Sequence, residues 1–440
     1  MNIKRIRNSN FFRIFNLKDD LAKGRTSMLV SSIIVTSNTF LTAGIFHTAF
    51  LIANDIDIVK VGIISFIPFL ANTFSIFSPF ILERFERRKG ILTLGRLLYY
   101  TLYILGVTLL PLVVKEQNAK VISFAVIVFI SNVINALTVT GYAAWHVNFI
   151  PNKVRADYIS YMQTLSYVFT GIVLIASSLI ADKLRGSAYE NTVLFSIRIF
   201  AYIIAIVDVA VLSLPKEFPY AKKAKIKLKN VFALPFSYKP FIYTMLITFS
   251  WTFVQNLTYS LLDYYLLNDV GVEYIFINAI NAGYAIFLLV FSRFWKRFLA
   301  KHSWFKTFGI AAIMYSPTTF LYSFATKATY IPIMLVVRLS QHFIGVGLNL
   351  TFANMVYVNL PEEDRTNYTS FHQFGANLSA FLGMLTGTTF VAVTKNFVIN
   401  LGNFGFTSVQ QLLVIQSICQ LLVALMVLKL LPKVEVNNED

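Results

Sequence analysis

Four charged side chains lie inside long apolar stretches of this sequence: Arg198, Asp208, Asp263 and Arg338. A charge at the centre of a bilayer costs about 2.5–3.5 kcal/mol on insertion scales, so such a residue needs a partner or a water-filled cavity. Arg338 lies near the middle of its stretch, and at helical spacing three polar residues share its side of the helix: Gln341, His342 and Asn349. A fixed cation among polar groups suits a ligand with carboxylate, phosphate or hydroxyl groups. We therefore predict that this polar stripe lines a solute cavity.

The composition places the stripe in a membrane. The chain of 440 residues is 56% hydrophobic and 13% charged, whereas about a quarter of the residues in soluble domains are charged. A helix needs about 20 apolar residues to cross the hydrocarbon core. Twelve such stretches are expected, at residues 28–53, 61–82, 91–114, 121–147, 158–181, 191–214, 240–268, 273–292, 307–326, 329–358, 367–394 and 403–428. Because backbone groups in lipid must bond within their own segment, we predict an all-α membrane protein.

An internal repeat divides these twelve spans into two sets. Pro151, Arg155, Tyr158, Ser160 and Gln163 recur 210 positions later as Pro361, Arg365, Tyr368, Ser370 and Gln373. Many transporters consist of two such repeated halves. The expected organisation is an N-terminal segment (1–27), a first six-helix bundle (28–214), a linker (215–239), a second six-helix bundle (240–428) and a tail (429–440).

The distribution of basic residues predicts the orientation. With the N-terminus inside, the cytoplasmic segments hold 29 Lys and Arg and the external loops hold 7. This asymmetry predicts that both termini and the linker lie in the cytoplasm. The membrane is expected to be the cell membrane. The net charge of +17 is thus a topology signal, and nucleic acid is not an expected partner. The linker lysines are expected near anionic lipid headgroups.

The loop that follows the second span reads I-L-E-R-F-E-R-R-K-G from Ile81. It resembles the acidic and basic loop of the major facilitator superfamily, with Glu83 in the acidic position and the usual glycines missing. In the related loop of the second half, Arg293 replaces the acid. The resemblance implies a fold of two pseudo-symmetric six-helix bundles and a secondary transporter that works by alternating access. It also implies a cytoplasmic gate formed by Glu83, Arg84, Arg87, Arg155, Arg365 and Arg297.

The same resemblance places the first, fourth, seventh and tenth spans around a central cavity. Besides the stripe of Arg338, the residues expected there are Asn38, Asn132, Asn135, Tyr142, Gln255 and Tyr259, extended by Gln163, Gln373 and Asn377. Asp263, the acid on a cavity span, is the candidate for coupling to a proton or cation. The alternative for the amides is a structural role, in which they form hydrogen bonds between helices. Such bonds contribute about 0.6 kcal/mol each on average.

Motifs for other chemistry are absent from the sequence. It has no G-x-x-x-x-G-K-[ST] loop, no H-E-x-x-H motif and a single cysteine, so we expect no enzyme activity, no cofactor and no metal site. The prediction is a monomeric secondary transporter for a small solute, with a preference for a small organic anion or a sugar-like solute. The alternatives are a polyspecific efflux pump for hydrophobic compounds and a non-transporting membrane receptor or assembly partner.

Overall fold

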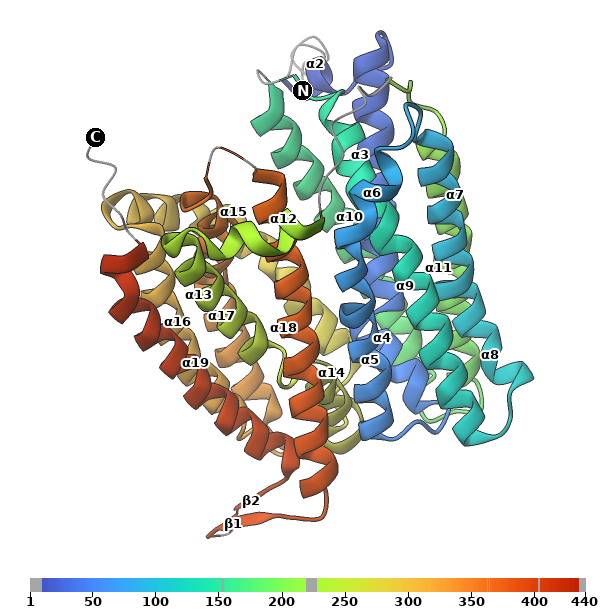
Figure 1. Cartoon of the computed structure of the whole chain (residues 1–440). Helices are drawn as coiled ribbons and strands as arrows, with labels where there is room; N and C mark the ends of the chain where they lie inside the picture. Colours follow the sequence, from blue (N-terminus) through green and yellow to red (C-terminus); the bar gives the residue numbers. More distant parts are fainter. Residues whose placement is uncertain are drawn as a thin grey trace, which may run out of the picture. The chain divides into compact units, whose positions relative to one another are not determined.

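The structure is a computed structural model that describes residues 10–151, 154–218, 228–361, 363, 365–402 and 404–434. These residues are mostly helical (Figure 1). Ten helical segments are long and apolar enough to cross a membrane. Two further expected spans also fold as helices, one of them interrupted after Gln255 and the other only 19 residues long. The predicted all-α membrane fold is therefore confirmed.

The chain forms two compact units. Unit 1 contains Met1–Asn54 and Phe77–Lys225, and unit 2 contains Asp55–Ile76 and Ile226–Asp440. The segment 55–76 is part of unit 2 although it follows the first helices of unit 1 along the chain. Its helix packs on two helices of the C-terminal half, and the short helix η1 (Thr73–Phe77) leads the chain back to unit 1.

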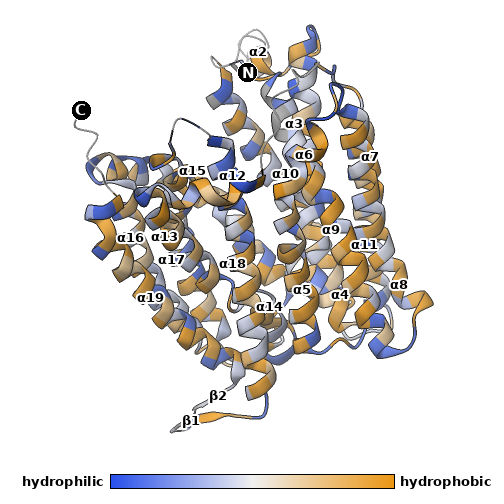
Figure 2. Ribbon diagram, viewed as in Figure 1, coloured by the Kyte–Doolittle hydropathy of each residue, from blue (hydrophilic) through white to orange (hydrophobic). Residues whose placement is uncertain are grey.

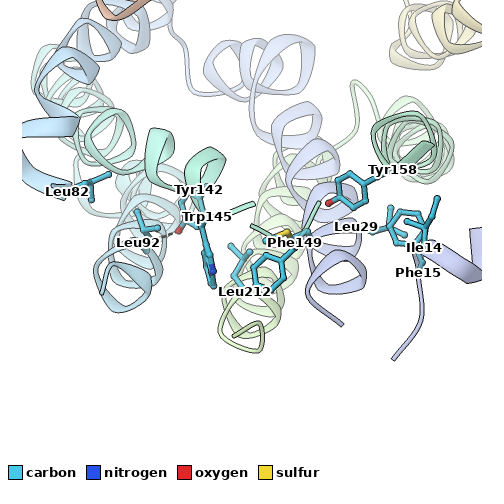
Figure 3. Close-up of a cluster of buried hydrophobic side chains, with 11 residues drawn as sticks. Ile14, Phe15, Leu29, Leu82, Leu92, Tyr142, Trp145, Phe149, Tyr158 and Leu212 are labelled. Atoms are coloured by element: carbon cyan, nitrogen blue, oxygen red, sulfur yellow. Dashed lines mark hydrogen bonds between the residues drawn. The ribbon is translucent and has the colours of Figure 1, made fainter. Parts of the chain in front are cut away.

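Unit 1 is a bundle built around its first long helix. Its elements are α2 (Asn10–Ile14), α3 (Asp20–Thr42), α4 (Gly44–Ile52), α6 (Ser78–Leu82), α7 (Lys89–Tyr100), the π-helix η2 (Thr101–Gly106), α8 (Val107–Val113), α9 (Gln117–Val147), α10 (Arg155–Lys183) and α11 (Glu190–Leu212). Helix α3 packs between α10 and α11, and α7 packs on α9. At one end, a buried cluster that includes Trp145, Phe149 and Tyr158 joins these helices (Figure 3).

Unit 2 contains one helix from the first half of the chain and all helices of the second. Its elements are α5 (Ile58–Asn72), α12 (Leu228–Ala233), η4 (Leu234–Phe236), α13 (Lys239–Gln255), α14 (Tyr259–Tyr264), the π-helix η5 (Tyr265–Val270), α15 (Tyr274–Lys301), α16 (Trp304–Tyr322), α17 (Tyr330–Val358), α18 (Arg365–Thr394) and α19 (Ser408–Val434). Helix α16 packs on α17 and α19, and α18 packs on α13 and α5. Apolar residues predominate along α5 and α19 (Figure 2).

Polar side chains fix where several helices begin. The Asp19 side chain accepts a hydrogen bond from the Ala22 N–H at the start of α3, at 2.7 Å. Asp57 accepts from the backbone N–H groups of Val59 and Lys60 at the start of α5, both at 3.1 Å. Such caps satisfy backbone donors that have no partner inside the helix. These caps fix the first residue of each helix, which the hydrophobic pattern alone does not determine.

One long helix of each unit is interrupted. In unit 1, Ala43 is extended and Gly44 has a φ of 55°, which ends α3 and starts α4. This left-handed conformation is the reason that a glycine occupies position 44. In unit 2, residues 256–258 separate α13 from α14. The sequence pattern predicted one span at 28–53 and one at 240–268. The first corresponds to the membrane-length segment Asp20–Ile52, and in both spans the structure adds a break that hydropathy does not indicate.

The last connection also differs from the expected boundaries. Residues 403–406 were predicted as the start of the last span, but an antiparallel hairpin pairs β1 (Ile399–Leu401) with β2 (Phe404–Phe406). Gly402 has a φ of 61° in its turn, and α19 begins at Ser408. The residues of β2 are apolar, so their hydropathy alone did not separate them from the helix that follows.

Candidate functional site

Unit 2 contains a polar cavity of about 270 Å³. Five residues that the sequence predicted for a solute cavity line it together: Gln255, Arg338, Gln341, His342 and Asn349. The last four come from one face of α17, and Gln255 is the last residue of α13 before the break. The rings of Trp251, Tyr284 and Tyr315 complete the polar wall.

Arg338 carries the positive charge of this cavity. Its guanidinium carbon lies 5.1 Å from the centre of the Tyr322 ring, a cation–π contact. The Asp263 carboxylate on α14 interacts electrostatically with it, but no salt bridge joins the two among the described residues. The charge of Arg338 is therefore only partly compensated.

Hydrogen bonds hold the other residues of the α17 stripe. Gln341 donates to the Thr318 hydroxyl at 3.2 Å, and the His342 Nε2 lies 2.8 Å from the Ile280 carbonyl oxygen. Asn349 donates to the Tyr284 hydroxyl at 2.7 Å. The buried Nε2 of Gln255 has no partner within the described part of the chain. It is thus a free donor at the cavity wall.

Unit 1 contains a second cavity of about 240 Å³. Three of the predicted residues line it: Asn38 from α3, and Asn135 and Tyr142 from α9. The wall also includes residues of α7 and η2, which were not among the predicted cavity elements. These two elements contribute Arg96, Tyr99, Tyr100 and Tyr103.

Arg96 and Asp208 form a buried salt bridge beside this cavity. The Arg96 Nε lies 2.8 Å from the Asp208 Oδ2, and the side chains are 13% and 0% exposed. The Tyr100 hydroxyl donates to the same Oδ2 at 2.9 Å. The 29 basic residues predicted for the cytoplasmic segments include Arg96, but the structure places Arg96 inside α7. The polar periodicity of α7 was the available signal, but the two residues of the pair are 112 positions apart in the sequence.

Arg198 on α11 is the other buried cation of unit 1. It is 1% exposed and donates to the Thr108 hydroxyl at 2.9 Å and to the Tyr103 carbonyl at 3.2 Å. A further donor lies 3.5 Å from the carbonyl of Thr42, the last residue of α3. The helix break at Ala43 and the π-helix both displace carbonyls from regular α-helical bonding. Arg198 therefore stabilises the two irregular helices that border the cavity.

Five predicted cavity residues lie elsewhere. Gln163, Tyr259 and Gln373 are exposed side chains, and neither cavity includes them. Asn132 donates to the Val128 carbonyl at 2.8 Å, and Asn377 donates to the Gln373 carbonyl at 2.9 Å. Both amides thus bond to carbonyls within their own helices, whereas the structural alternative expected bonds between helices.

The predicted gate residues lie at helix ends. Glu83 is half-buried at the end of α6, and the remaining gate residues are exposed: Arg84, Arg87, Arg155, Arg297 and Arg365. Among the described residues Glu83 forms no salt bridge. A different acid, Glu217, accepts hydrogen bonds from the backbone N–H groups of Arg88 and Lys89 and so caps α7. The repeated tyrosines Tyr158 and Tyr368 are buried in the clusters of units 1 and 2.

No family model matches the sequence, and no curated protein sequence is similar to it. Solved structures match over nearly the whole chain. A D-xylose–proton symporter, 12% identical, covers 95% of this chain and 99% of its own, with a TM-score of 0.69. The chain has the major facilitator fold. A mutant of the nucleoside transporter NupG, 12% identical, gives a TM-score of 0.68 over 92% of this chain and 99% of its own.

A bacterial homologue of the iron transporter ferroportin shares the major facilitator fold to the same degree. It is 12% identical, with a TM-score of 0.68 over 93% of this chain and 99% of its own. The fold implied by the loop at Ile81 and by the 210-residue repeat is therefore confirmed. The three matched proteins are named for different solutes: nucleosides, a sugar and iron.

Proposed function

We propose that this protein is a secondary transporter that moves a small organic anion or a sugar-like solute across the cell membrane by alternating access. The fold supports this class of function, because the matched proteins are named as transporters. The observation that carries the substrate class is the cavity of unit 2, where Arg338 stands among polar side chains. An arginine is permanently charged, and its planar group suits carboxylate, phosphate and hydroxyl oxygens.

Asp263 is the proposed coupling residue. It is the acid that interacts with Arg338, and a carboxylate can exchange a proton or cation as a solute enters or leaves. A solute anion at Arg338 competes with Asp263 for the same positive charge. Such competition couples solute binding to proton or cation binding at the acid.

Uptake into sealed vesicles tests the proposal. Purified protein is reconstituted, the vesicles are loaded with unlabelled citrate, gluconate or D-glucose, and entry of the labelled compound is followed. We expect counterflow of at least one of these three probes. Arg338→Gln should remove counterflow of an anion, whereas Arg13→Gln, which changes an exposed arginine of α2, should not. A chain that supports no counterflow of any probe, with correct insertion shown by its resistance to protease, would argue for the receptor alternative.

A further inference from the structure

The cavity of unit 1 contains an amide without a partner. Asn38 is 3% exposed, yet neither its amide nitrogen nor its amide oxygen has a hydrogen bond within the described residues. A buried polar group left unpaired is unfavourable for the folded protein. Asn38 lines the cavity, so a ligand there can use one donor and one acceptor that the protein itself does not use.

A bonded asparagine of unit 2 serves as the comparison for Asn38. Asn359 in unit 2 is also buried, at 7% exposure. Its amide nitrogen donates to the Thr244 hydroxyl at 2.9 Å and to the Val434 carbonyl at 3.0 Å. Asn38 differs from Asn359 because its amide is unpaired and borders a cavity.

The charge of the unit 1 cavity is balanced. Its cation, Arg96, has its salt bridge and its hydrogen bond to Tyr100 through Nε, and Asp208 supplies the opposite charge. The Arg96 guanidinium also interacts with the Tyr142 side chain. A net neutral wall does not favour an anion over an uncharged molecule.

Aromatic rings form much of the remaining wall. Tyr99 and Tyr103 are stacked, with ring centres 5.3 Å apart and planes 11° apart. Arg96 lies over the Tyr142 ring, 4.7 Å from its centre. Flat aromatic walls with a few placed polar groups favour a compact ring that has apolar faces and polar edges. The volume of about 240 Å³ is below the range of about 300–1,000 Å³ typical of pockets for drug-sized ligands.

We propose that the unit 1 cavity binds an uncharged ring that carries hydroxyl groups, with Asn38 as its specific hydrogen-bonding partner. This inference names a substrate class for the proposed transport function and rests on that function for its role in the cell. Free sugars and the ribose of nucleosides share this chemistry. The amide of Asn38 bonds to ring hydroxyls, Arg96 donates to a further oxygen, and the tyrosines cover the apolar faces of the ring.

Binding to the purified full-length protein tests the inference without any transport assay. The probes are D-glucose, uridine and citrate, measured by calorimetry. We expect D-glucose or uridine to bind and citrate not to compete with it. Binding of D-glucose identifies a free sugar as the source, whereas binding of uridine alone identifies a nucleoside. Asn38→Leu should raise the Kd of the bound probe about tenfold or more, equivalent to about 1.4 kcal/mol.

Stability of the ligand-free protein separates a binding role from a structural one. Asn38→Leu removes an unpaired amide, so we expect an unchanged or higher unfolding temperature. Asn359→Leu, the matched control, removes a bonded amide and should lower the unfolding temperature without changing the Kd. A drop in stability for Asn38→Leu that matches the control would show that Asn38 is structural and would overturn the inference.

Two further outcomes are informative. If neither D-glucose nor uridine binds the wild-type protein, the inference is wrong, while counterflow of an anion in vesicles would still support the proposed function. If D-glucose or uridine binds through Asn38 and no probe shows counterflow, the site exists and the proposed function fails. Binding in solution and counterflow in vesicles thus distinguish the two failures.

Discussion

The two units have related backbones and different charges. In both, one long helix breaks next to a cavity, at Ala43 in unit 1 and after Gln255 in unit 2. The repeat of 210 residues places Ala43 within about one helical turn of the second break. The ionic residues do not follow the repeat: Arg96 is paired with Asp208 in unit 1, and among the described residues of unit 2 Arg338 forms no salt bridge. The two cavities therefore border similar helix breaks but differ in their electrostatics.

The largest expected effect comes from breaking the compensated charge of unit 1. Asp208→Asn leaves Arg96 buried without its carboxylate, and removing one partner of a buried pair costs about 3–5 kcal/mol. We expect a strongly reduced unfolding temperature in detergent. The double variant Asp208→Asn with Arg96→Gln removes both charges and should recover part of the loss. Equal losses in the single and double variants would contradict the importance of this pair.

The next effect concerns the uncompensated charge of unit 2. Arg338→Gln should reduce uptake of an anionic substrate about 100-fold, equivalent to about 2.7 kcal/mol, because the cavity loses its cation. Membrane insertion and unfolding temperature should change little, since Arg338 forms no salt bridge. Initial rates in vesicles measure the effect. Loss of stability comparable to that of Asp208→Asn would mean that Arg338 is structurally paired, with Asp263 as the partner.

A smaller effect tests the two helix breaks. Gly44→Ala places a side chain at a φ of 55° and should cost about 1–2 kcal/mol, whereas the break in unit 2 contains no glycine. Gly283→Ala in the middle of α15, where an added Cβ meets open space, is the control and should be neutral or stabilising. Thermal unfolding compares them. Equal behaviour of the two variants would show that the break does not depend on the glycine.

The smallest effect is the pH dependence of a helix cap outside the membrane. Burial alone would raise the pKa of the Asp57 carboxyl, but hydrogen bonds from Lys60 and Val59 and the charge of Lys60 outweigh it and lower this pKa. The stability contributed by Asp57 is therefore fully present above about pH 4, the ordinary aspartate value, and is lost as pH falls through the lowered pKa. Unfolding temperatures between pH 3 and 6 should fall less steeply for Asp57→Asn than for the wild-type protein.

The sequence predicted most of the fold and part of the site. Hydropathy located the spans because each is a long apolar run, and the basic residues indicated a topology that stays a prediction. The face of α17 was found because helical periodicity places Arg338, His342 and Asn349 together within one element. The residues predicted for the unit 1 cavity did not include Arg96, because Arg96 and its partner Asp208 meet only through tertiary packing. The sequence also did not predict that the amide of Asn38 is unpaired. Its hydrogen-bond partners depend on the three-dimensional packing around it, and helical periodicity does not describe that packing.

The buried guanidinium of Arg198 has a consequence for how this protein responds to its surroundings. In membrane proteins with broken helices, the freed carbonyl oxygens at the end of a half-helix commonly coordinate a dissolved cation. At the end of α3 a guanidinium nitrogen of Arg198 approaches the Thr42 carbonyl. The positive charge at this break therefore belongs to a side chain of the protein and not to a dissolved ion. A tethered ion has an effective concentration that dilution cannot change. The break in α3 is therefore expected to keep its shape whether the medium contains sodium, potassium or very little salt.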